Sequence, residues 1–381
     1  MSRTVKENIV VLMLDLKAQH EKIGAEVEAA VKGVLESQQF ILGPEVRELE
    51  SEIASYCQCS HAIGCASGSD ALLLGLMACG VGSGDEVITS PFTFFATAGS
   101  IARLGATPVF VDIEPSSFNL DEDRIESVMT KRTRAIMPVH LFGQCADMDK
   151  INGLAERHSV AVVEDAAQAI GAQYKGRRAG SFSLVGAFSF YPSKNLGGAG
   201  DGGMLTTNDP VVAQRLRRAR AHGAKNIYFH EEVGINSRLD SLQAAILRVK
   251  LRYLDEWAEA RRANANRYEE LFTESGLLQS DLIVLPASRK DVYHVYNQFV
   301  IRAKDRDRLK QFLSEEGIGT EVYYPLSLHL QECFRYLGYE SGAFPESERA
   351  TKEALAIPVY PELEDAVLRY VVEKIAAFYS T

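Results

Sequence analysis

The lysine at position 194 follows an apolar run and lies in a loop of Pro, Ser and Gly residues, not on a charged helical face. A lysine amine that forms an imine must lose its proton, which requires a desolvated site or a neighbouring cation. Ser189 and Ser193 carry hydroxyls that can bind phosphate oxygens, and the glycines at 197 and 198 let the backbone approach a ligand. Because a loop lysine is usually a plain surface charge, the chemical interpretation of Lys194 depends on two further segments.

Two carboxylates, Glu164 and Asp165, end the apolar run that begins at residue 160. In open α/β sheets, ligands bind beyond the carboxyl ends of the strands. A carboxylate there can keep a heteroaromatic nitrogen protonated, and in pyridoxal phosphate (PLP) this makes the ring an electron sink. Asp is also a common helix N-cap, so these residues alone leave a cofactor ligand and a cap about equally supported.

A turn of small residues, Ala-Ser-Gly-Ser-Asp at 66–70, separates a predicted strand from a predicted helix. Small side chains allow backbone N–H groups and the helix N-terminus to approach a phosphate. The segment matches neither a dinucleotide-binding fingerprint nor a P-loop, and such a turn most often serves as an N-cap. In combination, however, a phosphate site, a carboxylate and a lysine in this order indicate a PLP enzyme.

A sheet must position these segments, because short apolar runs alternate with helical patterns between residues 60 and 220. This alternation predicts an α/β fold with a largely parallel sheet and helices on both faces. The expected strands are 62–65, 86–89, 107–111, 134–139, 160–164, 186–190 and 203–207, and the expected helices are 70–79, 94–104, 121–129 and 148–158. A short Gly-rich connection joins the last two strands, so we expect them to be antiparallel at least in part.

The remaining residues predict a smaller α+β unit. One helical pattern runs from 239 to 272 and is long enough to connect two domains. We expect strands at 292–301 and 318–323, helices at 305–316 and 365–378, and an N-terminal helix at 20–36 that packs toward this unit. We therefore divide the chain into a large PLP-binding α/β domain, residues 1–245, and a small C-terminal domain, residues 246–381.

The composition narrows the class of protein. The chain has 381 residues and a formal net charge of −10, which argues against nonspecific nucleic-acid binding. No run reaches the length of a membrane helix, and the apolar stretch 9–14 is shorter than a signal-peptide core, so we expect a cytoplasmic protein. The cysteines near His61 lack the spacing of a zinc site, so we expect free thiols and no metal.

With these segments together, the chain resembles the DegT/DnrJ/EryC1/StrS family of sugar-nucleotide aminotransferases over almost its whole length. The motifs that carry the resemblance are Phe-Ile-Leu-Gly-Pro-Glu at 40–45, Gly-Asp-Glu-Val-Ile at 84–88, the run 92–98, Glu-Asp-Ala-Ala-Gln at 164–168, 189–194, and Asn-Ser-Arg-Leu-Asp at 236–240. The last motif is difficult to explain by core packing. The resemblance implies PLP fold type I, the aspartate-aminotransferase fold, and a homodimer with shared active sites.

The resemblance also implies residue roles. Lys194 is the Schiff-base lysine and proton shuttle, Asp165 pairs with the pyridine nitrogen, Gln168 contacts the ring hydroxyl and Phe94 stacks on the ring. The implied phosphate-binding residues are Gly68, Ser69, Ser189 and, from the partner subunit, Asn236. Where this chain has Ser69 the family often has Thr, which preserves the hydroxyl.

The implied reaction is ping-pong transfer of an amino group from glutamate to a keto group of a nucleotide-linked hexose. The segments 143–149 and 236–247 resemble those of members that aminate C3 of UDP-linked 2-acetamido hexuronates or of dTDP-linked deoxyhexoses. The candidate substrate residues are Arg238, Tyr323, Tyr324 and His329. Sugar dehydratases of the family carry His at the lysine position, so Lys194 favours transamination. The residues leave two further functions open, which are a regulatory protein on a retained fold and a PLP enzyme that acts on free amino acids.

Overall fold

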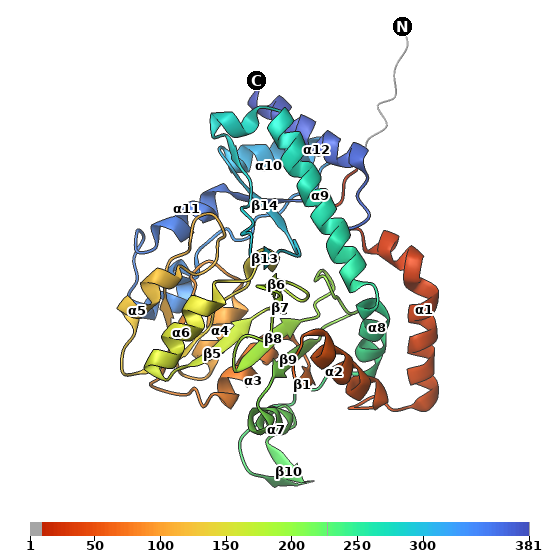
Figure 1. Ribbon diagram of the computed structural model, residues 1–381, viewed down its shortest axis with the longest axis vertical. Helices are drawn as coiled ribbons and strands as arrows, with labels where there is room; N and C mark the ends of the chain where they lie inside the picture. The colour runs from red at the N-terminus through yellow and green to blue at the C-terminus, as the bar shows by residue number, and fades with distance from the viewer. Residues whose placement is uncertain (1–9, 227, 381) are drawn as a thin grey trace.

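A seven-stranded sheet forms the centre of the protein in the computed structural model, which describes residues 10–226 and 228–380 (Figure 1). In sheet order the strands are β1 (His61–Cys65), β9 (Gly203–Thr207), β8 (Val185–Ser189), β5 (Ala161–Asp165), β4 (Thr133–Ile136), β2 (Glu86–Thr89) and β3 (Thr107–Phe110). The five strands from β8 to β3 are parallel, and β9 is antiparallel to both β8 and β1. The predicted parallel sheet and the antiparallel pair are confirmed.

Helices cover both faces of this sheet, because each carries an apolar side that is buried against the strands. One face is covered by α2 (Pro44–Tyr56), α6 (Met148–His158) and α8 (Ser241–Leu251), and the other by α3 (Gly68–Ala78), α4 (Ala96–Arg103) and α7 (Pro210–Ala219). The predicted helix 121–129 is instead a 3₁₀ turn, Glu122–Arg124, followed by the short α5 (Ile125–Val128).

Helix α3 is buried along almost its whole length and lies tightly against two strands that lead to the candidate site. At Gly75, a Cβ atom would lie 3.3 Å from a methyl group of both Val163 and Val185. This close approach holds α3 against β5 and β8, whose last residues are Asp165 and Ser189.

The C-terminal part forms a second core around a three-stranded antiparallel sheet, in the order β12 (Ile283–Val284), β14 (Phe299–Ala303) and β15 (Ala354–Ile357). Helices α9 (Leu254–Glu274), α10 (Arg306–Glu315) and α12 (Asp365–Tyr379) pack on it, and α11 (Pro345–Glu353) precedes β15. Helix α9 contributes Leu254 and Ala258 to the first core and Tyr268 and Phe272 to the second (Figure 1). The division at residues 245 and 246 stays a prediction, and residues 1–9 lie outside the described residues.

The single long helix predicted for 239–272 is wrong. The chain forms α8 and α9, separated at Arg252 and Tyr253, where backbone N–H groups bond to carbonyls three residues earlier. Both side chains at the break turn to the same carboxylate, Glu26 of α1 (Leu16–Ser37). The helical pattern continues through the break because its residues favour helix on either side.

The strand predicted for 292–301 is also wrong, because two short strands in different sheets replace it. Strand β13 (Val292–Tyr293) pairs with β6 (Gln173–Tyr174), which pairs with β7 (Arg177–Arg178), and β14 begins only at Phe299. Between them the backbone turns at Tyr296, where φ is 44°. The predicted strand 318–323 is reduced to isolated bridges at Ile318 and Glu321.

The N-terminal helix forms as predicted, but it lies chiefly along α8 at the outer side of the large sheet unit (Figure 1). Its Lys22 reaches Glu362 of the C-terminal part at 3.8 Å. A hairpin of β10 (Ala224–Asn226) and β11 (Phe229–His230) projects beyond α7 (Figure 1). Within the described ranges, no helix is both long and apolar enough to cross a membrane.

Candidate active site

A cavity of about 470 Å³ brings together the three segments that suggested chemistry. It lies where β5 and β8 end, beside the start of α3 and the loop that leads into α4. Ten of the residues singled out from the sequence line this cavity: Gly68, Ser69, Phe94, Asp165, Gln168, Ser189, Ser193, Lys194, Tyr323 and Tyr324. The structure adds residues that the sequence reasoning missed, among them Thr93, Thr97, Tyr191, Asp201 and Gln298.

One end of the cavity is a cradle at the N-terminus of α3. The Ser67 hydroxyl accepts a hydrogen bond from the Asp70 N–H at 3.1 Å and caps the helix. Gly68 lies directly against Ser189, since a Cβ atom on Gly68 would be 2.5 Å from the Ser189 Cβ. The first N–H groups of the helix and two serine hydroxyls therefore face the same space, an arrangement that suits a phosphate.

Asp165 is buried at the floor of the cavity. Its Oδ2 accepts a hydrogen bond from the Thr97 hydroxyl at 2.8 Å, and its Oδ1 accepts one from the Ala167 N–H at 3.2 Å. Burial raises the pKa of this carboxyl, while the Thr97 and Ala167 hydrogen bonds and the charge of Lys194 oppose the rise. Thr97 gave no signal in the sequence, because its pairing with Asp165 joins residues 68 positions apart.

Burial lowers the pKa of Lys194 to about 8, and the negative charge of Asp165 limits the fall. The loop around Lys194 is fixed on both sides. The Lys194 N–H donates to the Tyr191 carbonyl at 2.8 Å, and the Asn195 amide donates to the Val295 carbonyl at 3.1 Å. Asn297 donates to Asn195 Oδ1 at 2.7 Å. The lysine is therefore held in a desolvated position where its amine is a much better nucleophile than a surface lysine.

The neighbouring Glu164 points away from the cavity and is a structural residue. Its carboxylate accepts hydrogen bonds from the N–H groups of Gly180, Phe182 and Ser183 at 2.6–3.0 Å. It also lies 3.1 Å from His140 Nε2, and because His140 Nδ1 accepts the Ala146 N–H, Nε2 is the nitrogen that donates. Of the two carboxylates that end this strand, only Asp165 is available to a ligand.

The side chain of Gln168 has a defined orientation. Its Oε1 accepts the Phe142 N–H at 2.7 Å, so its NH₂ group faces the cavity and reaches the Tyr324 hydroxyl at 3.2 Å. The turn that supplies Phe142 is held by Asn119, which accepts the Leu141 N–H and donates to the Gln144 carbonyl.

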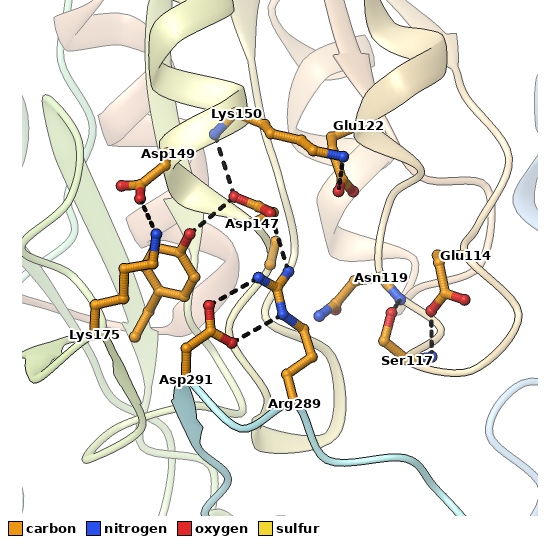
Figure 2. Close-up of polar contacts among 12 residues, drawn as sticks. Glu114, Ser117, Asn119, Glu122, Asp147, Asp149, Lys150, Lys175, Arg289 and Asp291 are labelled. Atoms are coloured by element: carbon orange, nitrogen blue, oxygen red, sulfur yellow. Dashed lines mark hydrogen bonds and ion pairs between the residues drawn. The ribbon is translucent and has the colours of Figure 1, made fainter.

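A charged cluster outside the cavity anchors the same turn. Figure 2 shows Arg289 between Asp147 and Asp291, with Nη–Oδ distances of 3.2 and 3.0 Å. Asp147 caps α6 and also accepts the Tyr174 hydroxyl at 3.0 Å. The cluster therefore ties the segment before β13 to the turn and helix that follow β4.

Aromatic side chains form another part of the wall. Phe94 is 59% exposed and its ring centroid lies 6.5 Å from that of Tyr324, which lies 5.8 Å from that of Tyr323. Burial raises the pKa of Tyr324, so its hydroxyl stays protonated near neutral pH. Phe94 thus presents an open ring face above a cavity that contains Asp165.

Three predicted residues do not line this cavity. His329 does not lie where we predicted it: its side chain is fully buried, 3.2 Å from Glu348 and against the Phe344 ring, and it packs within the chain outside the cavity. Arg238 is half-buried and Asn236 is exposed, both in the segment that precedes α8. Among residues 10–226 and 228–380, no group of three metal-ligating side chains is assembled.

Comparisons with known proteins agree with this geometry. The chain is 53% identical over 96% of its length to a pleiotropic regulatory protein of Geobacillus stearothermophilus, covering 98% of that protein. It is 45% identical over 92% of its length to a dTDP-3-amino-3,4,6-trideoxy-alpha-D-glucose transaminase of Streptomyces venezuelae, covering 91% of it.

Solved structures have the same fold. A crystal structure of S. venezuelae DesV in complex with a ketimine intermediate matches with a TM-score of 0.94 and 43% identity, covering 98% of this chain and 99% of the other. The cavity, its lysine and carboxylate, and these relatives lead to one assignment: because the family's sequence model matches residues 21–376, the chain belongs to the DegT/DnrJ/EryC1/StrS aminotransferase family and has the PLP fold type I.

Proposed function

We propose that the protein uses PLP to transfer an amino group from glutamate to a keto group of a nucleotide-linked sugar. The observation that carries this proposal is that the amine of Lys194 and the carboxylate of Asp165 share one buried cavity with the N-terminal cradle of α3. A related Bacillus subtilis structure, 30% identical, is described with bound cofactor PMP, the amine form of PLP.

The cavity residues fit PLP group by group. Gly68, whose missing side chain opens the cradle, acts with Ser69 and Ser189 to bind the phosphate. Asp165 would accept a hydrogen bond from the protonated pyridine nitrogen, and the NH₂ group of Gln168 would donate one to the ring hydroxyl. Phe94 stacks on the ring with its exposed face.

When bound, PLP supplies an electron sink for the charge that develops at the amine-bearing carbon of the substrate. Lys194 would hold the cofactor covalently, and once released its Nζ would take the proton from that carbon and deliver it to the cofactor carbon that had carried the lysine. Its lowered pKa, about 8, lets the same amine act as base and then acid near neutral pH. Burial raises the pKa of Asp165, and the hydrogen bonds that Thr97 and Ala167 donate to it oppose this rise and favour the ionised carboxylate.

Support for a sugar acceptor comes from relatives. Proteins 43% and 42% identical to the chain are named a UDP-N-acetyl-3-dehydro-alpha-D-glucosamine 3-aminotransferase and a UDP-2-acetamido-2-deoxy-3-oxo-D-glucuronate aminotransferase. Together with the dTDP-sugar transaminase they favour amination at C3. Tyr323 and Tyr324, which line the cavity, are the proposed substrate contacts on this chain.

The site also requires a second subunit in this proposal. Asn236 is exposed and absent from the cavity of its own chain, as expected for a residue that reaches the phosphate in a partner's site. Arg238, two residues further, is proposed to reach the substrate from the same side. We therefore propose a homodimer with shared active sites.

The name of the Geobacillus relative favours regulation as a second role. A regulator that retains no chemistry has no need for a buried lysine with a lowered pKa opposite a buried carboxylate. We therefore regard regulation as an addition to catalysis and not as its replacement.

The absorption spectrum of the purified protein tests the proposal. With PLP we expect a yellow band from the lysine-bound cofactor, which glutamate converts to the band of the amine form. Absence of any band after PLP is added, with the protein folded by circular dichroism, would refute PLP binding and bring the regulatory role to the front. A band that glutamate leaves unchanged would refute glutamate as the donor.

A further inference from the structure

A glutamine of the C-terminal unit contributes to the cavity wall a side-chain oxygen that has no hydrogen-bond partner among the described residues. Gln298 lies directly before β14 and lines the cavity wall with Tyr323 and Tyr324. Its amide oxygen, Oε1, is buried and accepts no hydrogen bond from the part of the chain that the structure describes. Buried polar atoms are almost always paired in native proteins, so an unpaired one in a cavity wall indicates a missing ligand.

The backbone holds Gln298 in this orientation. The Asn297 side chain bonds to Asn195 and Phe299 is buried in the second core, whereas Gln298, which lies in a bend between them, lines the cavity. The N–H groups of Asn297 and Gln298 both donate to the Phe142 carbonyl, at 2.9 and 3.4 Å. These bonds fix the backbone from which the Gln298 side chain extends into the cavity wall.

The location of Gln298 points to the sugar and not to the cofactor. The groups that fit PLP come from the large sheet and its loops, whereas Gln298 belongs to the opposite wall. An amide carries both a donor and an acceptor and no charge, which matches a hydroxyl or acetamido group. Lys194 is the only cation among the described residues of this chain that line the cavity, while Asp165 and Asp201 are acidic. The second cation proposed near the substrate, Arg238, would come from the partner subunit on the side of the phosphate, so the wall that contains Gln298 offers no cation to a ligand carboxylate.

From this geometry we infer that Gln298 is a substrate-recognition residue that hydrogen-bonds an uncharged hydroxyl or acetamido group of the sugar. The inference rests on the proposed function and extends it, because it predicts a preference for neutral hexoses over hexuronates. A site that hydrogen-bonds a substrate group rejects analogues that leave its polar atoms unpaired.

Two keto sugars form a matched pair for the test. They are UDP-N-acetyl-3-dehydro-α-D-glucosamine and UDP-2-acetamido-2-deoxy-3-oxo-D-glucuronate. Both have the same nucleotide, an acetamido group and a ketone at C3. They differ at one ring substituent, which is uncharged in the first sugar and a carboxylate in the second. The enzyme is first converted to its amine form with glutamate, and the rate at which each sugar restores the yellow band is measured. We expect the glucosamine derivative to react faster in the wild-type enzyme.

The decisive variant is Gln298→Met, which keeps the length of the side chain and removes the hydrogen bonds. We expect kcat/KM for the glucosamine derivative to fall about tenfold, the value of one to two neutral hydrogen bonds. The rate of the glutamate half-reaction and the retention of PLP are expected to stay at wild-type values. Gln173→Met, at a half-buried strand glutamine outside the cavity, is the matched control.

Each other outcome overturns the inference. These outcomes are a wild-type preference for the glucuronate, reaction with neither sugar, or an equal loss in both half-reactions of Gln298→Met. Failure of the proposed function is distinguishable from these, because it removes the yellow band or its response to glutamate in the wild-type enzyme before any sugar is added.

Discussion

The Thr97 hydroxyl donates a hydrogen bond to Asp165 Oδ2 across 2.8 Å, in a position where both residues are buried. Thr97 is itself 3.0 Å from the hydroxyl of Thr93, which lines the cavity. The three side chains form a row that ends at the carboxylate proposed to hold the cofactor nitrogen. Because Asp165 is otherwise bonded only through Oδ1 within the described part of the chain, Thr97 determines how the carboxylate is turned.

We expect Thr97→Val to weaken PLP binding about tenfold or more, since a hydrogen bond to a charged group contributes on the order of 1.5–3 kcal/mol. The loss also raises the pKa of Asp165 further, so the cofactor spectrum of the variant should change at higher pH than in the wild type. Equilibrium titration with PLP and the pH dependence of the absorption band measure both effects. Thr97→Ser should restore both PLP affinity and the pH dependence of the band.

Thr89→Val is the control, because the buried Thr89 hydroxyl donates to the Met137 carbonyl and not to Asp165. Equal effects in both valine variants would contradict the proposed role of Thr97.

Lys194→Met should abolish turnover and at the same time stabilise the protein prepared without PLP. The pKa of Lys194 is about 8 in the folded state, below its ordinary value of 10.5, so the folded state binds the proton less tightly than the unfolded state. The lysine therefore lowers the free energy of unfolding by its full contribution below pH 8, and this destabilising contribution decreases as the pH rises toward 10.5. Urea denaturation at about pH 7 and about pH 10, on either side of the folded-state pKa, measures the difference between variant and wild type. If the difference in free energy of unfolding between variant and wild type does not decrease at the higher pH, the amine is not desolvated in the folded state.

Gly68→Ala should prevent stable PLP binding, because its Cβ would lie 2.5 Å from the Ser189 Cβ and force the cradle open. We expect this variant also to unfold at lower temperature than the wild type. Gly33→Ala is the matched control: Gly33 lies in α1, where an added Cβ atom would meet nothing within 4 Å, so alanine there should stabilise by about 0.5–1 kcal/mol. Thermal unfolding with and without PLP separates the two effects. If Gly68→Ala retains PLP normally, the phosphate does not bind in the cradle beside Gly68.

Subunit mixing tests the shared site. Lys194→Ala and Asn236→Ala should each be inactive or weakly active alone. When the two are mixed and exchange subunits, each mixed dimer contains a site with the intact lysine of one chain and the intact asparagine of the other. Activity should therefore return with the time course of exchange. If no activity returns while labelled subunits do exchange, Asn236 acts within its own chain or not in the site at all.

The sequence predicted the large sheet well because its strands are short apolar runs bounded by turns, and each run forms a single strand of the sheet. It predicted Lys194, Asp165 and Ser189 as a group for the same reason: Asp165 ends one such strand, Ser189 ends the neighbouring strand and Lys194 follows it. The carboxyl ends of parallel strands meet at one edge of the sheet. The residue pattern alone could not distinguish Glu164 from Asp165, and only the family resemblance selected Asp165. The direction of the Glu164 carboxylate depends on N–H groups of residues 180, 182 and 183, which come from a distant loop.

The errors share a physical cause, which is that tertiary contacts override local pattern. The residues 239–272 favour helix throughout, yet Arg252 and Tyr253 interrupt it where they meet Glu26, more than 200 positions earlier in the chain. The apolar run 292–301 has the pattern of one strand and is divided by the turn at Tyr296. Thr97 and Gln298 were missed because neither residue type nor spacing distinguishes them; only their place beside Asp165 and in the cavity wall does.

The hydrogen bonds of Asn195 have a consequence for biosynthesis. Its partners, Val295 and Asn297, lie 100 and 102 residues later in the chain. During translation the seven strands of the large sheet are complete well before these residues leave the ribosome. The nascent protein therefore contains its lysine early, but the hydrogen bonds that fix the loop around it form only after residues 295 and 297 have been synthesised. We expect a chain that ends before these residues to lack the fixed loop.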